Sequence, residues 1–323
     1  MTHSPDPDLE PDQALADRPS GPAPMRVGQV IEVGVRILRR HWRPALGLAL
    51  LFAGPGALLA AATGVHFGEV ALETFPGLAT GEVDTEITVS NADLERLFGA
   101  LVPVLVANLI ASVLMSIGAL AFAAVVADDY HARPATLGKA VHACVRRTPS
   151  AFGFMLVTSL VIVGVTLTGL MAMSLSTVAL PAASVTAGGP GVFLALVALV
   201  ATVVVLVYLT MRWAPAFPAM VEEGLGARAA LRRSWFLSAD NVWRIFFISL
   251  LAALVTSFGG SMLSRLIAIV LAAALGSDGI VAETLAVALG SVLLAPLMPV
   301  LIAVLYFDLR ARRDLPAASG PRL

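Results

Sequence analysis

Long apolar segments dominate this sequence and restrict what it can fold into. Several are about 20 residues long or more, enough for a helix to cross a hydrocarbon layer of roughly 30 Å. Lipid offers the backbone no hydrogen-bonding partner, so such segments cross as helices or as closed barrels. Over the whole chain 58% of residues are apolar and 13% are charged, whereas a soluble domain carries about 25% charged residues. The sequence therefore predicts an all-α, polytopic membrane protein.

The apolar segments divide the chain into spans and tails. We predict about six transmembrane helices, at about 44–64, 97–126, 150–174, 190–212, 242–264 and 281–306. The apolar run 266–275 is too short to cross by itself and is expected to extend or follow the fifth span. Residues 1–25 are predicted to be a disordered tail, 26–314 the integral membrane domain and 315–323 a flexible C-terminal tail. The first 24 residues lack the apolar stretch of a cleavable signal peptide.

Charge alternates between successive connections and predicts the orientation. Every second connection is basic, and residues 65–96 between the first two spans are predominantly acidic. By the positive-inside rule the basic side is cytoplasmic, which places both termini in the cytoplasm. All but one of the basic residues are Arg, a bias typical of GC-rich bacterial genomes. For a multi-pass protein of a bacterium, we expect the plasma membrane as the location. The Trp and Tyr residues fall at the same ends of the spans, where amphipathic rings favour the interface: Trp42, Trp213, Trp235, Trp243, Tyr130, Tyr208 and Tyr306.

Three basic segments share a pattern that predicts a repeat. Residues 27–40, 137–147 and 225–235 each place apolar side chains on one helical face and basic ones on another, as in helices that lie in the membrane interface. A break is expected after each, at Pro44, at Pro149 and at Asp240–Asn241. Each segment then leads into a pair of spans. The chain therefore predicts a threefold repeat of an amphipathic helix followed by a helical hairpin.

The same segments resemble a known family. RVGQVIEVGVRILRRHWRPALGLALL (26–51), YHARPATLGKAVHACVRR (130–147), the stretch 214–251 with LRRSW, and LYFDLRARRD (305–314) are similar to bacterial proteins with the glycerophosphoryl diester phosphodiesterase membrane domain. In some members this membrane region is joined to a soluble phosphodiesterase barrel. Such a barrel needs roughly 200–250 residues, more than any predicted non-spanning segment here, so the resemblance implies the membrane region without the catalytic part.

Motifs for catalysis or metal binding do not emerge from the sequence. It has no Gly-rich phosphate loop with Lys, no zinc-protease helix motif and no nucleophile elbow. Asp128, Asp129, His131 and His142 fall in one connection, but their spacing matches no established ligand pattern. Glu222 and Glu223 are expected to form ion pairs with Arg228, Arg232 or Arg233. We therefore predict a protein that is not an enzyme and holds no metal or cofactor.

Two further features bear on transport. No Asp, Glu, Lys or Arg falls near the middle of a predicted span, which disfavours an ion-coupled pump. Pro55 within Gly54–Pro55–Gly56, together with Pro296 and Pro299, interrupts the first and sixth spans. Proline kinks a helix, and interrupted spans line substrate sites in transporters. These prolines are hinge candidates.

The leading functional hypothesis is a basic cytoplasmic face that binds anionic lipid headgroups or a protein partner. Its contact candidates are Arg36, Arg39, Arg40, Arg146, Arg147, Arg228, Arg232 and Arg233. One alternative is a transporter or channel for a lipid-like or small solute. Another is an accessory subunit of a glycerophosphodiester- or lipid-metabolising enzyme. Self-association into a homo-oligomer stays open, and the net charge of −1 gives no indication of nucleic-acid binding.

Overall fold

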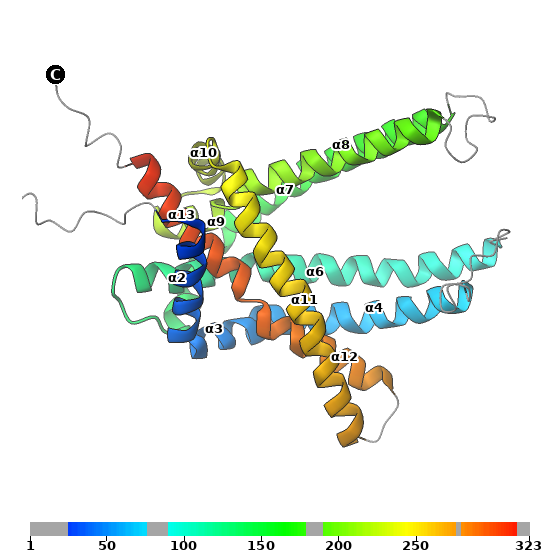
Figure 1. Cartoon of the computed structure of the whole chain (residues 1–323), viewed down its shortest axis with the longest axis horizontal. Coiled ribbons are helices and arrows are strands. Elements are labelled where there is room, and N and C mark those ends of the chain that lie inside the picture. Colours follow the sequence, from blue (N-terminus) through cyan, green and yellow to red (C-terminus); the bar gives the residue numbers. More distant parts are fainter. Residues whose placement is uncertain (1–24, 76–89, 179–189, 276–278, 315–323) are drawn as a thin grey trace, which may run out of the picture.

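The computed structural model describes residues 25–75, 90–178, 190–275 and 279–314, and these ranges contain helices and turns but no strand. The predicted tails therefore lie outside the described residues, apart from Met25. Figure 1 shows the helices. They are α2 (Val27–Arg40), α3 (Trp42–Leu48), the π-helix η1 (Ala49–Ala53), α4 (Gly54–Thr74), α6 (Asn91–Tyr130), α7 (Leu137–Val178), α8 (Pro190–Trp213), α9 (Ala216–Glu222), α10 (Ala227–Ser238), α11 (Val242–Leu275), α12 (Gly279–Leu294) and α13 (Leu297–Asp314).

Six helical segments are long and apolar enough to cross a membrane, which confirms an integral membrane protein with six candidate spans. They are Trp42–Thr74, Glu95–Tyr130, Leu137–Ala172, Phe193–Glu222, Val242–Ala274 and Val281–Asp314. Most extend beyond the predicted ends, because the helices continue into polar sequence on both sides. The run 266–275 continues α11 without a break, as expected.

The predicted breaks agree with the structure at one position and differ at two. Asp240–Asn241 separates α10 from α11, as expected. The first break falls at His41, and Pro44 lies in the first turn of α3, where its missing N–H costs nothing. The break predicted at Pro149 is wrong, because Pro149 lies inside α7.

The continuity of α7 through Pro149 has a packing explanation. Cys144 and Ala151, on either side of the proline, are fully buried, so both sides of the potential kink are fixed against the core. The Cys144 thiol donates to the Ile117 carbonyl at 3.1 Å, and the Thr148 hydroxyl donates to the Cys144 carbonyl at 3.1 Å. Such local bonding lets spanning helices tolerate proline.

Helix α13 lies at the centre of the fold. All residues from Ala303 to Leu309 are buried in it, including the large Tyr306. Helices α2, α6, α9, α10 and α11 surround it. Hydrophobic burial contributes roughly 25 cal/mol per Å² only where apolar surface leaves water. Inside a membrane the close packing of these side chains, more than solvent exclusion, is what stabilises the arrangement.

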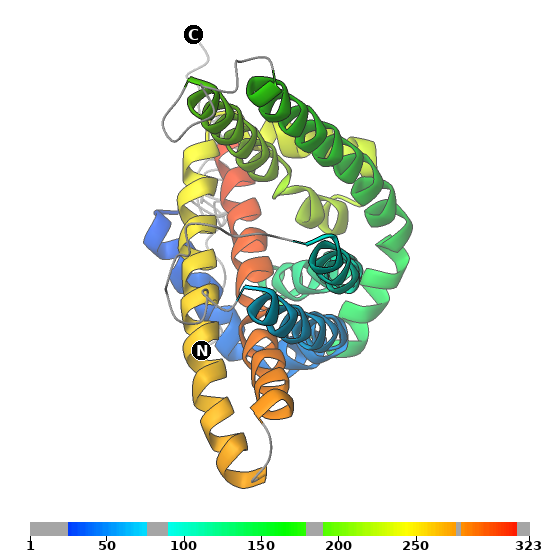
Figure 2. The same ribbon diagram turned by 90° about the vertical axis from the view of Figure 1, so that its right-hand side faces the viewer.

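Three helical hairpins extend from this centre: α4–α6, α7–α8 and α11–α12 (Figures 1 and 2). Small residues allow close approach within them, since a Cβ added at Gly56 would lie 2.8 Å from the Ala111 backbone. Only the first and third hairpins follow a separate amphipathic helix, α2 and α10; the second expected one forms the start of α7. The threefold repeat as a whole stays a prediction.

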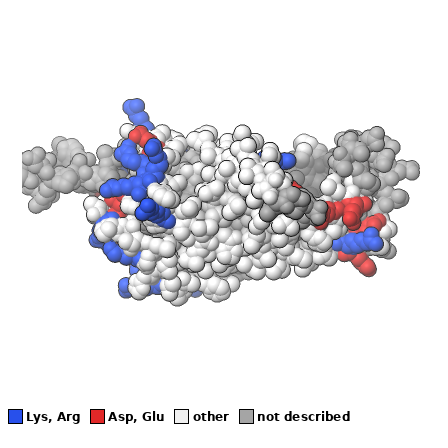
Figure 3. Space-filling view, turned by 90° about the horizontal axis from the view of Figure 1, so that it is seen from below, with Lys and Arg blue, Asp and Glu red and all other residues white. Residues whose placement is uncertain are grey.

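Charge is segregated along the long axis of the molecule. Figure 3 shows most Lys and Arg gathered at one end and most Asp and Glu at the other, with little charge on the surface between them. We call the first the basic end; it comprises α2, α9, α10, the first three turns of α7 and the last part of α13. This distribution fits a protein that crosses a membrane.

Candidate functional site

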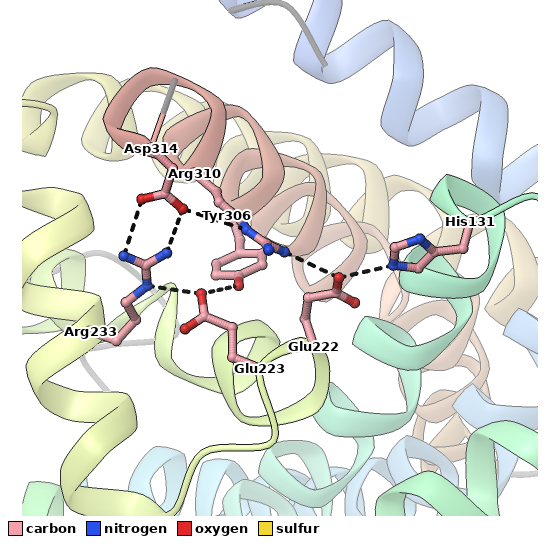
Figure 4. A network of polar contacts seen from close by, with 7 residues as sticks. All are labelled: His131, Glu222, Glu223, Arg233, Tyr306, Arg310 and Asp314. Atoms are coloured by element: carbon pink, nitrogen blue, oxygen red, sulfur yellow. Dashed lines mark hydrogen bonds and ion pairs between the residues drawn. The ribbon is translucent and has the colours of Figure 1, made fainter. Parts of the chain in front are cut away.

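The basic end contains a network of ion pairs centred on Glu223 and Arg233 (Figure 4). Arg233 Nε donates to Glu223 Oε1 at 2.8 Å, and its two terminal nitrogens donate to Asp314 at 2.7 and 3.3 Å. The Tyr306 hydroxyl donates to the same Glu223 oxygen at 2.7 Å. Burial tends to lower the pKa of Arg233, but its hydrogen bonds to Asp314 and Glu223 outweigh burial and raise it. Arg233 is therefore fixed by acidic partners from α9 and α13.

Glu222 continues this network on its other side. Its Oε1 accepts from Arg310 at 3.2 Å and lies 2.9 Å from His131 Nε2. Arg310 also lies 3.6 Å from Asp314. The expected pairing of Glu223 with Arg233 is thus confirmed, whereas Glu222 pairs with groups that the sequence interpretation did not suggest. Together these contacts join α9, α10, α13 and the end of α6.

A second cluster is built on Asp308, which is fully buried. Arg244 Nε and Arg312 Nε each lie 3.0 Å from Asp308 Oδ2, and the Met25 amide donates to Oδ1 at 2.6 Å. Both arginines also donate to the Met25 carbonyl. A buried carboxylate needs such partners to remain charged. This cluster ties Met25, two residues before α2, to α11 and α13.

Two smaller groups of contacts also hold the helices of the basic end together. Asp129 Oδ1 lies 2.8 Å from His41 Nε2 and accepts from Arg40 at 3.2 Å. Arg212 stacks on the Trp235 ring at 4.3 Å from its centroid, and the Ser234 hydroxyl donates to the Arg212 carbonyl at 2.6 Å. The LRRSW stretch thus holds α10 against the end of α8.

One basic cluster differs from these. A hollow of about 430 Å³ between the start of α7 and α9 is lined by Gly138, Lys139, His142, Ala143, Arg146, Arg147 and Val221. Lys139 Nζ donates to the Pro134 carbonyl at 3.4 Å, and Arg147 donates to the Gly224 carbonyl at 3.0 Å. Within the described ranges, no carboxylate pairs with Lys139, Arg146 or Arg147. The hollow therefore holds positive charge that no carboxylate of the described residues neutralises.

The predicted contact residues divide into two groups. Six are exposed: Arg36, Arg39, Arg40, Arg146, Arg228 and Arg232. Arg147 and Arg233 are partly buried and hold neighbouring elements together. Arg147 in particular bonds the carbonyl of Gly224, whose positive φ of 70° marks the turn between α9 and α10 as a glycine position.

The aromatic residues differ in exposure, and the four candidate metal ligands do not come together. Trp42 and Trp243 are exposed as expected of interfacial rings, but Tyr306 is fully buried and Trp213 nearly so. Asp129 and His131 bind different partners, and no group of three metal-ligating side chains comes together in the described parts of the chain. The sequence does not predict the cluster of Asp308, Arg244 and Met25, because only the packing of the helices brings these residues together. The YFDLR motif, which contains Asp308, is the sequence feature that points to this cluster.

The hinge candidates lie at real interruptions of the spans. Helix η1 widens the backbone just before Gly54, and Pro55 lies in the first turn of α4. Pro296 lies in the turn between α12 and α13, and Pro299 follows in the first turn of α13. The two interruptions are neighbours, since a Cβ at Gly54 would lie 4.0 Å from Val292.

Part of the chain is similar to a known protein family. Residues 191–309 match the family described as the membrane domain of glycerophosphoryl diester phosphodiesterase. The expected resemblance is confirmed over this segment. It covers α8 to α12 and most of α13 and so includes LRRSW, the first four residues of YFDLR, and Asp308 with Arg244. Searches of curated proteins and of solved structures found no match.

Proposed function

We propose that this membrane protein is not an enzyme and that it binds the anionic headgroup of a membrane lipid in the hollow between α7 and α9. One observation carries the proposal: Lys139, Arg146 and Arg147 line a cavity without a carboxylate partner among the described residues, whereas Arg233, Arg244 and other basic-end arginines are ion-paired. Each cation near a membrane surface contributes about 1 kcal/mol of attraction to anionic lipid.

The surroundings of the hollow suit a lipid. Leu137, Val145 and Phe152 on α7 are exposed apolar side chains close in sequence to the cationic ones, with Val145 64% exposed. A phosphate in the hollow would leave the acyl chains to lie along this apolar surface. The proposal also places the basic end in the cytoplasm of a bacterial cell, where the positive-inside rule and the anionic inner leaflet coincide.

Native mass spectrometry of the gently extracted protein tests the lipid site. Lys139→Gln with Arg146→Gln should weaken retention of phosphatidylglycerol roughly 30-fold, because two contacts of about 1 kcal/mol are lost. The matched control is Arg228→Gln with Arg232→Gln, which removes the same charge from exposed positions of α10 and should change retention less than threefold. Equal losses in the two pairs would refute a specific hollow and leave net charge as the cause. A soluble protein retained in place of lipid would favour the partner hypothesis.

A transporter or channel is the second candidate, favoured by the neighbouring interruptions at η1 and Pro296. Interrupted spans that pack together resemble the substrate sites of transporters. Reconstituted protein should then move a labelled phospholipid between leaflets, and Pro296→Ala should reduce the rate. An unchanged rate relative to protein-free vesicles would reject this candidate. The accessory-subunit hypothesis predicts co-purification with a soluble phosphodiesterase.

A further inference from the structure

A second cavity lies between α11 and α12, away from the basic end. It has a volume of about 810 Å³, within the 300–1,000 Å³ typical of ligand sites. Its polar lining comes from Thr256, Ser257, Ser261, Ser264 and Arg265 on α11 and from Glu283 and Ser291 on α12. The helices meet closely at its centre, where a Cβ on Gly290 would overlap the Ser264 hydroxyl. We call this cavity the α11–α12 groove.

The groove carries one charge on each of two candidate membrane-spanning helices. Arg265 belongs to the fifth candidate span, nine residues before its end at Ala274, and Glu283 is the third residue of the sixth. Both charges therefore lie toward the same end of their spans and away from the middle. Ten apolar residues follow Arg265 to the end of α11. Figure 1 shows α11 running obliquely to α4 and α6, so the end of α11 and the start of α12 do not reach as far along the long axis as the far ends of α4 and α6. Ionisable groups inside a membrane are costly and mark functional sites by default.

The two charges of the groove are separated from each other. Both Arg265 and Glu283 are exposed, and in the described part of the chain neither forms an ion pair with the other or with a third side chain. A cation and an anion on opposite walls of one cavity are complementary to a ligand that carries both signs. A single anion would satisfy Arg265 and leave Glu283 without a partner.

The hydroxyl groups and the flanking apolar surface narrow the ligand class. Ser261 and Ser291 donate to carbonyls of their own helices at 2.7 Å, so their oxygens keep lone pairs that can accept from an ammonium group. Phe258, Met262 and Ile269 on α11, each about 70% exposed, offer apolar surface beside the groove. A ligand that matches these features carries a phosphate for Arg265, an amine for Glu283 and acyl chains for the apolar surface.

We infer that the α11–α12 groove binds a zwitterionic aminophospholipid, with the phosphate on Arg265 and the ammonium group on Glu283. The serine hydroxyls add acceptors for the ammonium group, and the acyl chains lie along the exposed face of α11. This site is separate from the hollow between α7 and α9, which selects for anionic charge. The two sites therefore differ in the lipid that they prefer.

The test uses the full-length protein in nanodiscs with equal phosphatidylethanolamine and phosphatidylglycerol, followed by native mass spectrometry of the retained lipids. Glu283→Gln should lower retained phosphatidylethanolamine about tenfold and leave phosphatidylglycerol unchanged. Arg265→Gln should lower it by a similar factor, while Arg265→Lys should restore most of it. The charge-matched controls are Glu73→Gln and Arg96→Gln, which line a different cavity between α4 and α6 and should have no effect.

Each outcome decides the inference. Unchanged phosphatidylethanolamine in both groove variants would overturn it, as would an equal loss in the control variants. A dimer that dissociates in Arg265→Gln, with no lipid lost, would assign the groove to a contact between two copies and also overturn it. Lys139→Gln with Arg146→Gln should leave phosphatidylethanolamine retention unchanged, so failure at one site is distinguishable from failure at the other. Thermal unfolding in detergent confirms that each variant is folded.

Discussion

The span that ends in α13 and the span that contains α8 are similarly apolar but are stabilised very differently. At the basic end α13 is buried on nearly every side, and ion pairs join it to α9, α10 and α11. In the most apolar stretch of α8 none of the residues is buried, against 44% in the sixth candidate span. Hydropathy identifies both segments as spans, and only the degree of burial distinguishes them.

The difference indicates which part of the protein determines the arrangement of the helices and which part contacts lipid or another apolar surface. Buried ion pairs define one arrangement of helices, because breaking any of them leaves a charge without a partner. The exposed surface of α8 carries no such restriction and suits lipid or another apolar surface. We therefore expect substitutions at the basic end to alter folding and those on α8 to leave it nearly unchanged.

The largest effect is expected at Asp308. Asp308→Asn removes the carboxylate shared by Arg244 and Arg312, and removal of one member of a buried ion pair costs about 3–5 kcal/mol. Unfolding in detergent, followed by circular dichroism, measures the loss. Asp240→Asn is the control, since Asp240 also pairs with an arginine, Arg313, but its side chain is 78% exposed. Equal stability of the two variants would contradict a stabilising role for the Asp308 cluster.

A matched pair of valines tests the comparison within the apolar parts. Val304 on α13 is fully buried and Val204 on α8 is 59% exposed. Val304→Ala should lower the free energy of unfolding by about 2 kcal/mol because it leaves a cavity, whereas Val204→Ala should change it by less than about 0.5 kcal/mol. The same unfolding assay compares them. A larger loss of stability in Val204→Ala than in Val304→Ala would contradict the comparison and show that α8 packs against a further surface.

A smaller effect is expected at Tyr306. Tyr306→Phe removes the hydrogen bond to Glu223 and keeps the ring, so it should cost about 1.5 kcal/mol, typical of a bond to a charged group. Tyr208→Phe provides the control, because Tyr208 is exposed on α8. Thermal unfolding of both variants distinguishes a lost bond from a lost hydroxyl in general.

The smallest effect is expected at the start of α6. Ser90 accepts from the Asp93 amide at 3.1 Å and caps the helix, so Ser90→Ala should cost about 1 kcal/mol. The Ser90 hydroxyl and amide lower the pKa of Asp93 by hydrogen bonding. That contribution is present above the ordinary Asp pKa and is lost as the pH falls through the lowered value. The difference between wild type and Ser90→Ala should therefore shrink in acid; a difference independent of pH would exclude Asp93 from the cap.

Much of the fold follows from the sequence, because hydropathy and helical periodicity act locally. They predict the six spans, α2, α10 and the break at Asp240–Asn241. The continuity of α7 through Pro149 could not be predicted in this way, since it depends on Cys144 and Ala151 packing against the core. The burial of Tyr306 escapes local rules for the same reason.

The candidate site was predictable in kind but not in detail. Positive charge on one side of the membrane predicted a cationic face, yet all arginines look alike in sequence. The structure distinguishes Arg233, fixed by Glu223 and Asp314, from Arg146, which lines a hollow. The place of Arg265 on a spanning helix could not be predicted, because the fifth span was predicted to end one residue before it. Ion pairs between distant segments, such as Arg244 with Asp308, require the fold to be known.

Hydrogen–deuterium exchange of the protein in nanodiscs, with and without phosphatidylglycerol, tests the central proposal most directly. If anionic headgroups bind in the hollow, adding phosphatidylglycerol should slow exchange in residues 137–147 and at the α9–α10 turn, where Arg147 holds Gly224. Lys139→Gln with Arg146→Gln should abolish this protection. Protection confined to α2 or α10, or persisting unchanged in that variant, would contradict the proposal.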